Sequence, residues 1–366
     1  MKVLPRLNAL QRPFDQTRVW LPIAFEGAPP CRSNLIGVRL MSSGGMSRIQ
    51  QLASTAGQGM RKLNAQDPLG SLNPRLYQPQ LPRLTSEYEN SDILGALQSM
   101  SIDESASSEI FGYATQDFER FVHTVALLPQ GAGTVLEIGA NPYFTTMLAQ
   151  WFRSDLHFTL TNYFGGEPVE KGQSLRVRHP SGRTEQHQVR YHNINVESTA
   201  LPFGDASFDC VMFCEVLEHL TTDPLFPLLE FRRVLKPGGH LVLTTPNVAR
   251  LENVARMVAG ANLYDPYSGY GAYGRHNREY TRHELWHLLH HCGFSDDIFF
   301  TGDVGTNRAP NYLQQISVLE PLLRNRRADL GEYHFTRWKV GGAANKLRPS
   351  WLYRSLPESE LDPAMI

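Results

Sequence analysis

The sequence predicts an α/β fold in which helices cover both faces of a mostly parallel β-sheet. The first observation is that short runs of Val, Leu, Ile and Phe alternate with segments of helical periodicity between residues 134 and 244. The second is that Gly, Pro and Asn follow these runs, as they do where a strand ends in a turn. The third is that 366 residues, 41% of them hydrophobic, suffice for one large core with appendages. Strands that alternate with helices are typical of parallel sheets.

The charge balance and the cysteines exclude several classes of protein. Lys and Arg number 35 and Asp and Glu number 36, so no global field favours nucleic acid or an anionic membrane. The four cysteines lack the C-x-x-C spacing of zinc sites and indicate reduced thiols in a cytoplasmic protein. No stretch approaches the roughly 18 consecutive apolar residues of a membrane-spanning helix. We therefore expect no membrane span, and nucleic acid is disfavoured as a partner.

Residues 1–85 differ in composition from the rest of the chain, because Gly, Pro, Ser, Asn and Gln are frequent and apolar runs are short. Such a segment is predicted to be extended or disordered. Seven basic and two acidic side chains fall within residues 1–60, a bias that mitochondrial transit peptides share. A misassigned start, with Met41, Met46 or Met60 as the first residue, is a third interpretation.

Residues 86–130 are predicted to form a helical cap before the first strand of the sheet. Apolar residues recur there at helical spacing, and a Pro and two Gly then end the run. The next elements are a strand at 134–138, a helix at 145–152 and a strand at 157–161. A tight turn that begins at Gly139 joins the first of these strands to its helix.

The middle of the chain contains a predicted β-hairpin and two further β–α units. The hairpin joins residues 174–178 to 184–190 through a Pro-Ser-Gly turn. The later elements are a strand at 207–213, a helix at 225–234 and a strand at 240–244.

Three more elements complete the prediction. A helix begins after Thr281, because Thr281 and Glu284 form a capping-box pattern ahead of a leucine stripe. Its four histidines fall largely on the opposite, solvated face, so they are interpreted as inert. Residues 298–300 are expected in the sixth strand of the sheet, and residues 313–319 in the last one.

Five segments, taken in order, resemble the motifs of class I S-adenosylmethionine-dependent methyltransferases, including ubiquinone-biosynthesis-type O-methyltransferases. They are Val-Leu-Glu-Ile-Gly at 135–139, Leu-Pro-Phe at 201–203 with Ser-Phe-Asp at 207–209, Glu-Val-Leu-Glu-His at 215–219, Arg-Val-Leu-Lys-Pro-Gly-Gly at 233–239 and Thr-Pro-Asn at 245–247. The resemblance implies a Rossmann-like, seven-stranded, mostly parallel sheet with helices on both faces and an antiparallel last strand. It implies a methyltransferase domain at 131–320 and a tail at 321–366, whose aromatic residues could pack on the core or meet a second subunit of a homodimer.

The resemblance places the methyl donor, S-adenosylmethionine, at the carboxyl ends of the strands, where the strand order of a parallel sheet reverses. Gly139 lets the backbone approach the donor, and Glu137 can accept hydrogen bonds near its methionine end. A turn glycine without a ligand is the alternative for Gly139. Asn141 and Tyr143 replace two glycines that the family usually has, and Asn141 could preserve the turn by adopting a positive φ.

Further candidates for donor binding follow later strands. Asn162 stands where the family usually has an acid that holds the ribose hydroxyls, and an amide can also bond a diol. The segment with Asn195 and Glu197 resembles the loop beside the adenine, and the sequence leaves open which side chain faces it. Glu215, after the fourth strand, is expected to line the donor site as well.

Two glutamates and two histidines form a candidate metal site. Glu218 and His219 lie three and four positions after Glu215, so the three can share one face of a helical turn. Together with His276 they resemble the magnesium-binding pattern of small-RNA 2′-O-methyltransferases. A bound Mg²⁺ would hold an acceptor oxygen and lower its pKa. Without metal, His219 or His276 could be the general base, or a structural histidine only.

The acceptor is expected to be a small molecule. A loop at residues 261–273 has four tyrosines among glycines and a proline, which suits stacking on a sugar, an aromatic ring or a polyketide, or closing as a lid. The resemblance implies methyl transfer to an oxygen of a sugar, a polysaccharide precursor or a natural product. Two alternatives stay open: an RNA 2′-O-methyltransferase that uses the metal site, and a catalytically silent methyltransferase-like binding protein.

Overall fold

The computed structural model describes residues 79–103, 107–131, 133–305 and 309–363. The interpretations of residues 1–78 lie outside the described residues. Helices α2 (Asn90–Gln98) and α3 (Ser107–Ala126) form the part of the chain where a helical cap was expected. Among the described residues, no helix combines the length and the apolar character that crossing a membrane requires.

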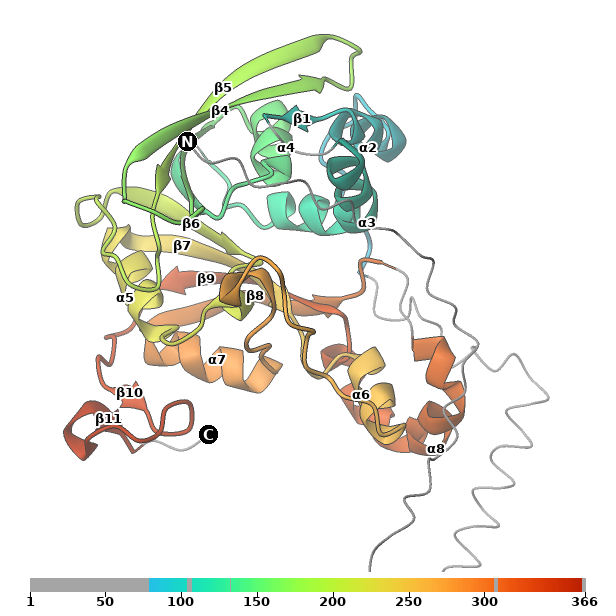
Figure 1. Ribbon diagram of the computed structural model, residues 1–366, viewed down its shortest axis with the longest axis vertical. Helices are drawn as coiled ribbons and strands as arrows, with labels where there is room; N and C mark the ends of the chain where they lie inside the picture. Colours follow the sequence, from blue (N-terminus) through green and yellow to red (C-terminus); the bar gives the residue numbers. More distant parts are fainter. Residues whose placement is uncertain (1–78, 104–106, 132, 306–308, 364–366) are drawn as a thin grey trace, which may run out of the picture. The chain divides into compact units, whose positions relative to one another are not determined.

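Nine strands form one sheet in the order β1-β4-β5-β3-β2-β6-β7-β9-β8 (Figure 1). The pairs β5–β3, β3–β2, β2–β6 and β6–β7 are parallel, whereas β9 is antiparallel to both β7 and β8. The strands from β5 to β8 form the expected Rossmann-like sheet, and the predicted hairpin adds β4, with β1 paired to its outer edge. The bounds are β1 Ser101–Ile102, β2 Gly133–Ile138, β3 Leu156–Asn162, β4 Glu170–Arg178, β5 Thr184–Asn193, β6 Phe208–Cys214, β7 Leu235–Pro246, β8 Phe294–Gly302 and β9 Tyr333–Val340.

The last strand of the sheet is not where the sequence predicted it. Residues 313–319 belong to helix α8 (Leu313–Leu323), and the antiparallel strand is β9. Ile316, Leu319 and Leu323 recur at helical spacing and pack with Leu251 in a small cluster apart from the sheet, so the strand prediction was wrong. The sheet therefore continues beyond residue 320, into residues expected to form a tail.

Neighbouring residues of each central strand point to opposite faces, and helices cover both faces (Figure 1). Val135 of β2 packs in a cluster with residues of α2, α3 and α4 (Phe144–Phe152), whereas Leu136 packs with α5 (Leu225–Val234) and α7 (Arg282–His291). In β6, Met212 belongs to the first cluster and Phe213 to the second. Strands buried on both faces have continuous apolar sequences, which is why the sequence predicted these strands.

Helix α7 begins as predicted. The N–H of Glu284 donates to the Thr281 hydroxyl at 3.2 Å, and the Glu284 carboxylate accepts the N–H of Thr281 at 2.9 Å. Leu285, Leu288 and Leu289 are fully buried against the sheet side of the helix. The capping box and the leucine stripe are therefore confirmed.

The strand order reverses between β2 and β6, because α4 leads from β2 to β3 on one side while β6 is followed by α5 and β7 on the other. A crevice is expected at the carboxyl ends of these two strands. Elements that follow β7 reach the same end of the sheet, among them α6 and η2. The remaining bounds are η1 Leu217–His219, α6 Leu251–Val258, η2 Ala272–Gly274, η3 Ala309–Tyr312, η4 Arg324–Asp329, β10 Arg348–Pro349, η5 Glu358–Glu360 and β11 Leu361–Asp362.

Candidate active site

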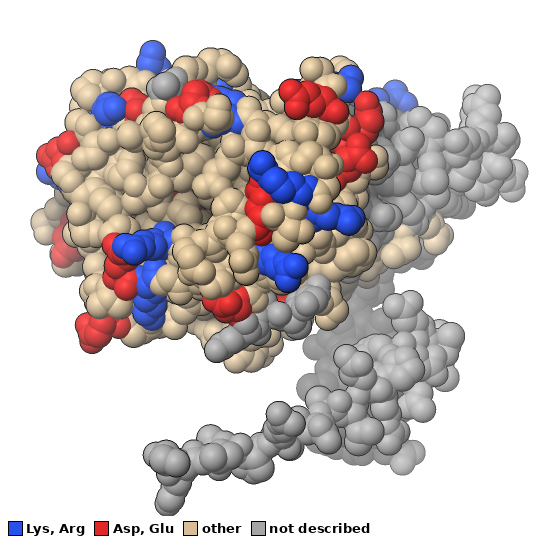
Figure 2. All heavy atoms as spheres, turned by 90° about the horizontal axis from the view of Figure 1, so that it is seen from above, with Lys and Arg blue, Asp and Glu red and all other residues tan. Residues whose placement is uncertain are grey.

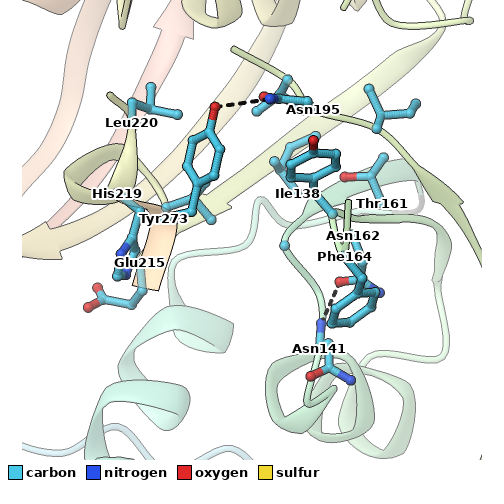
Figure 3. Close-up of a pocket in the computed structure, with 15 residues that line it drawn as sticks. Ile138, Asn141, Thr161, Asn162, Phe164, Asn195, Glu215, His219, Leu220 and Tyr273 are labelled. Carbon is cyan, nitrogen blue, oxygen red and sulfur yellow. Dashed lines mark hydrogen bonds between the residues drawn. The ribbon is translucent and has the colours of Figure 1, made fainter. Parts of the chain in front are cut away.

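A cavity of about 290 Å³ opens at the carboxyl ends of β2, β3, β5 and β6, and we call it the strand-end cavity. Figure 3 shows two groups of polar side chains on its two sides. The turn side consists of Gly139, Asn141 and Asn162, and the acid–histidine side consists of Glu215 and His219 with the neighbouring Glu218 and His276. The cavity lining comprises Ile138, Gly139, Asn141, Thr161, Asn162, Tyr163, Phe164, Ile194, Asn195, Val196, Glu215, Val216, His219, Leu220 and Tyr273.

The turn after β2 requires a glycine at position 139. Gly139 has a φ of 70°, in the left-handed region that side chains disfavour. A Cβ atom there would lie 2.7 Å from Cγ2 of Val216, which is too close for two carbon atoms. The backbone of the turn can therefore border the strand-end cavity directly, as predicted for Gly139.

Asn162 holds the turn together from the end of β3. Its Oδ1 accepts the N–H of Asn141 at 2.8 Å, and its Nδ2 donates to the Tyr143 hydroxyl at 3.0 Å. Both ends of the amide thus have protein partners, and its expected bond to a ribose diol stays a prediction. The residue with a positive φ is Tyr143, at 69°, so the expectation that Asn141 would adopt this conformation was wrong. The Tyr143 ring is buried in the core beside Phe144.

The two candidates of the loop after β5 differ in where they point. Asn195 lines the cavity, and its Nδ2 donates to the Tyr273 hydroxyl at 3.0 Å (Figure 3). Glu197 instead accepts the N–H groups of Thr221 at 2.7 Å and Asp223 at 2.9 Å. Burial raises the pKa of Glu197, but these hydrogen bonds outweigh it and hold the pKa below its usual range. Of the two, Asn195 is therefore the side chain that borders the cavity.

Glu137 lies beneath the turn and is not part of the cavity lining. Its carboxylate accepts the hydroxyl of Thr146, on α4, at 2.6 Å. Burial raises the pKa of Glu137 to about 7, although the Thr146 hydrogen bond lowers it. The observed hydrogen bond connects β2 to α4. A contact between Glu137 and the methionine end of a donor stays a prediction.

Glu215 follows β6 with a φ of 56°, a conformation that few residues other than glycine adopt. Its Oε1 accepts the hydroxyl of Thr244 at 2.9 Å and lies 3.8 Å from Nη1 of Arg120. Burial raises the pKa of Glu215 to about 8, and the Arg120 guanidinium opposes this rise. Glu215 therefore lines the cavity next to a positive charge that the sequence did not reveal, and its contact with a donor stays a prediction.

Arg120 comes from the middle of α3 and is 5% exposed. Its Nε donates to Asp117 at 3.1 Å and its Nη2 to the Tyr113 hydroxyl at 2.7 Å. The guanidinium also lies 5.5 Å from the centre of the Tyr333 ring in β9. The available signal was an Asp–Arg pair, three residues apart, on the apolar face of a predicted helix, where charges are rarely buried unless paired.

Glu218, His219 and His276 are brought together, with one potential ligand atom of each within 4.8 Å of the others. The imidazole rings of His219 and His276 lie 5.1 Å apart, edge to face. His219 Nδ1 donates to the carbonyl oxygen of Arg275 at 3.0 Å, and His276 Nδ1 donates to Glu279 at 2.9 Å. Glu215, predicted as a further metal ligand, is not part of this group.

His276 does not line the strand-end cavity but lines a second one, of about 920 Å³. Helix α3, the end of β7, α6 and the segment before β9 contribute to it, so the N-terminal cap forms one of its walls. His219 lines the strand-end cavity and His276 lines the second one. The two neighbouring histidines therefore line different cavities, one at the strand ends and a larger one to which the cap contributes.

The tyrosine loop presents one ring to the site and three to solvent. Tyr264, Tyr267 and Tyr270 are 85%, 92% and 88% exposed. Tyr273 turns inward, where its hydroxyl donates to Glu197 at 2.9 Å and its ring meets Tyr163 edge to face. Tyr273 is thus the tyrosine of this loop that lines the strand-end cavity, and the lid interpretation stays a prediction.

Comparison with known proteins finds one family and several relatives. Residues 167–243 match the family model of a methyltransferase domain. The chain is similar to a probable S-adenosylmethionine-dependent methyltransferase of Mycolicibacterium smegmatis, with 32% identity over 118 residues, 32% of this chain and 39% of the relative. It is also similar to dimethylglycine N-methyltransferase of Parasynechococcus marenigrum, with 31% identity over 37% of this chain and 49% of the relative. The chain thus spans less than half the length of either relative.

Solved structures with a similar fold include an S-adenosylmethionine-dependent methyltransferase from Mesorhizobium loti. The likeness covers 59% of this chain and 95% of that chain, with 14% sequence identity and a TM-score of 0.35.

Proposed function

We propose that the chain transfers a methyl group from S-adenosylmethionine to an oxygen of a small polar acceptor. The match of residues 167–243 to a methyltransferase-domain family and the strand order of the sheet support this proposal. The acceptor class is a sugar, a polysaccharide precursor or a hydroxylated natural product. One observation carries this proposal. His219 lines the strand-end cavity, His276 lines the second cavity, and the centres of their rings lie 5.1 Å apart.

The residues of the strand-end cavity fit S-adenosylmethionine, the cofactor of this family. When bound, it supplies a methyl group to the acceptor's lone pair, and its sulfur keeps the electrons of the broken bond. Gly139 leaves the backbone open where a Cβ atom would meet Val216. Asn195 offers an amide beside the cavity, and Glu215 offers a carboxyl group near a ligand that carries positive charge.

His219 and His276 are assigned to the acceptor oxygen. A hydroxyl group gives up its proton as its oxygen takes the methyl group, and the proton passes to an imidazole or to water. Both imidazoles have their Nδ1 atoms fixed by hydrogen bonds, so each presents Nε2 in a defined direction. Fixed orientation of the acceptor beside the donor is expected to supply much of the acceleration.

The lining of the second cavity favours a polar acceptor. Seven of its sixteen lining residues have charged side chains, among them Arg250, Glu279 and Glu332, and the lining includes the Tyr333 ring. Arg250 is paired with Glu279, so these charges are held in place before an acceptor enters. Hydroxyl groups of a sugar can form hydrogen bonds with such carboxylates and guanidinium groups. A wholly apolar acceptor would displace water from these groups without replacing its hydrogen bonds, which costs free energy.

The surface charge does not favour RNA as the acceptor. On the face shown in Figure 2, the Lys and Arg side chains of the described residues are interspersed with Asp and Glu. A protein that neutralises many phosphates presents a basic groove or stripe instead.

The test is a turnover assay with S-adenosylmethionine and separate panels of hexoses, amino sugars, phenols and short RNA. S-adenosylhomocysteine formation and a matching gain of one methyl group in a hydroxylated small molecule are expected. His276→Ala should slow this turnover about 100-fold or more, since acid–base or ion-assisted steps contribute that much. His283→Ala, which changes an exposed histidine of α7, is the matched control and should leave the rate unchanged. Turnover with RNA alone, or a rate indifferent to His276→Ala, contradicts the proposal.

A further inference from the structure

We propose that Tyr353 and Arg348 of the C-terminal segment, residues 341–363, are positioning residues for the strand-end cavity. They hold Asp223, and Asp223 ends a loop, residues 221–223, whose other contacts reach the wall of the cavity. Neither Tyr353 nor Arg348 lines the cavity, so any effect on a ligand must pass through this loop. The proposal rests on the proposed function, in which the cavity binds the methyl donor.

The C-terminal segment is fixed to the core by contacts that do not involve the cavity. The N–H of Asn345 donates to the carbonyl oxygen of His291, the last residue of α7, at 2.9 Å. Strand β10 pairs with β11, and the rings of Trp351 and Tyr353 pack against the core cluster that contains α5 and α7. The segment therefore presents the Tyr353 hydroxyl and the Arg348 guanidinium from an anchored backbone.

Asp223 directs its side chain and its backbone to different partners. Oδ1 accepts the Tyr353 hydroxyl at 2.7 Å, and Oδ2 accepts Nη2 of Arg348 at 2.6 Å. Burial raises the pKa of Asp223, but these two hydrogen bonds outweigh it and hold the pKa below its usual range. The N–H of Asp223 donates instead to Oε1 of Glu197 at 2.9 Å. Asp223 thus joins the C-terminal segment to the loop after β5.

The Glu197 carboxylate carries the connection to the cavity wall. It is 6% exposed, and it accepts the N–H of Thr221 at 2.7 Å and the Thr221 hydroxyl at 2.8 Å. Its Oε2 also accepts the Tyr273 hydroxyl at 2.9 Å, and that hydroxyl accepts Nδ2 of Asn195 at 3.0 Å (Figure 3). Tyr273, Asn195 and Leu220, which precedes Thr221, all line the strand-end cavity. Two carboxylates in series therefore connect the C-terminal segment to this wall.

The strength of these contacts explains why distant side chains can matter. Hydrogen bonds to ionised carboxylates are stronger than those between neutral groups, and a carboxylate that loses a partner is left undersatisfied. Asp223 is only 18% exposed, so water replaces a lost partner only if the residue turns outward. Its N–H would then turn away from Glu197, and the hold of Glu197 on Tyr273 would loosen. A ligand in the cavity is then expected to leave faster.

The first measurement is amide hydrogen exchange of the full chain without ligand, followed by mass spectrometry. Tyr353→Phe is expected to speed exchange in the peptide that contains residues 221–223 about fivefold, the equivalent of one hydrogen bond. Peptides of the turn at 139–141, on the other side of the cavity, should keep their rates. Arg348→Met should act in the same direction, and Arg348→Lys should restore much of the protection because it keeps the positive charge.

Arg354→Met is the matched control, because Arg354 follows Tyr353 and its side chain is exposed. It should leave every exchange rate unchanged. Urea denaturation of each variant distinguishes a local opening of the loop from a general loss of stability. Unchanged exchange at 221–223 in Tyr353→Phe, or equal acceleration in all peptides, overturns the proposal.

The second measurement is a double-mutant cycle on the dissociation constant of S-adenosylhomocysteine, determined by calorimetry. Tyr353→Phe and Tyr273→Phe are each expected to raise this constant about fivefold. Because both act through Glu197, the double variant should weaken binding by clearly less than the product of the two effects. A product of the two effects would mean that Tyr353 acts independently of the cavity wall, which contradicts the proposal.

The two measurements separate this proposal from the proposed function. A wild-type chain that binds no S-adenosylhomocysteine contradicts the proposed function and, with it, the role in donor binding. Hydrogen exchange at 221–223 still decides, without any ligand, whether Tyr353 and Arg348 hold the loop. Normal donor binding in the wild type with no effect of Tyr353→Phe or Arg348→Met contradicts the role of the C-terminal segment alone.

Discussion

The two sides of the strand-end cavity satisfy their polar groups differently. On the turn side, Asn162 uses both ends of its amide to hold Asn141 and Tyr143. On the acid–histidine side, Oε1 of Glu218 has no hydrogen-bond partner, and Glu215 has a φ of 56°. Tyr143 in the turn also has a positive φ, of 69°, so the two sides differ in hydrogen bonding: the Asn162 amide is bonded at both ends, whereas Oε1 of Glu218 has no partner.

This contrast indicates where a ligand can act in a fold of this kind. Unpaired buried atoms and disfavoured backbone conformations cost stability, so they persist where other contacts outweigh them and a ligand can use them. In this chain Glu215 lines the strand-end cavity, and Glu218 precedes His219, which lines the same cavity. Substitutions on each side can show whether buried charge pairs stabilise the acid–histidine side and whether burial stabilises the turn side.

The largest effect is expected from removing the compensating charge of the acid–histidine side. Arg120→Met leaves Asp117 and Glu215 buried without their positive partner, which should lower the free energy of unfolding by about 3–5 kcal/mol. Urea denaturation followed by circular dichroism measures it. Arg190→Met breaks a pair in which the arginine is 82% exposed, so its effect should stay below about 1 kcal/mol. Equal losses of unfolding free energy in the two variants would mean that the buried pairs of Arg120 stabilise the fold no more than an exposed pair does.

An intermediate effect is expected from Glu137, beneath the turn side. Burial raises its pKa from 4.5 to about 7, so the folded chain keeps a proton that the unfolded chain releases. This contribution to stability is present below pH 4.5 and is lost as the pH rises through 7, a change of roughly 3 kcal/mol. Unfolding free energies at pH 5 and pH 8 should therefore differ less in Glu137→Gln than in the wild type. Identical differences in the two proteins would refute the assignment.

The smallest effect is expected at Tyr273 of the tyrosine loop, which lines the strand-end cavity away from both sides. Tyr273→Phe removes a hydroxyl that donates to Glu197 and accepts from Asn195. Loss of about 1 kcal/mol should speed dissociation of S-adenosylhomocysteine roughly fivefold, measured by stopped-flow displacement. Tyr264→Phe, in a side chain that is 85% exposed, should leave the rate unchanged. A Tyr273→Phe rate equal to that of Tyr264→Phe argues against a lid.

The parts of the fold that the sequence predicted are those with local signals. Strands β2, β3, β6 and β7 are continuous apolar runs, and α7 carries its own capping box. Residues 313–319 were misassigned because an apolar segment of this length fits a strand as well as a helix, and only packing against α6 decides. Strand β9 was missed because alternating polar residues such as His334 and Thr336 are buried in it.

The candidate site was predictable in its residue types and less so in its contacts. Gly139 and the Glu218–His219–His276 group follow from motif and chemistry. Arg120 could not be joined to Glu215 from sequence, because the two lie on different elements that only folding brings together. Which of Asn195 and Glu197 faces the cavity likewise could not be predicted, because the N–H groups of residues 221–223, distant in sequence, bind the Glu197 carboxylate.

The most direct test of the central claim, that the strand-end cavity binds the methyl donor, is calorimetric titration of the full chain with S-adenosylhomocysteine. We predict binding of one molecule per chain in the micromolar range, which Gly139→Arg abolishes because a side chain there meets Val216. Gly112→Arg, on an exposed position of α3 with open space around it, should bind as the wild type does. A wild-type chain that takes up no S-adenosylhomocysteine, or a Gly139→Arg chain that binds it equally well, contradicts the account.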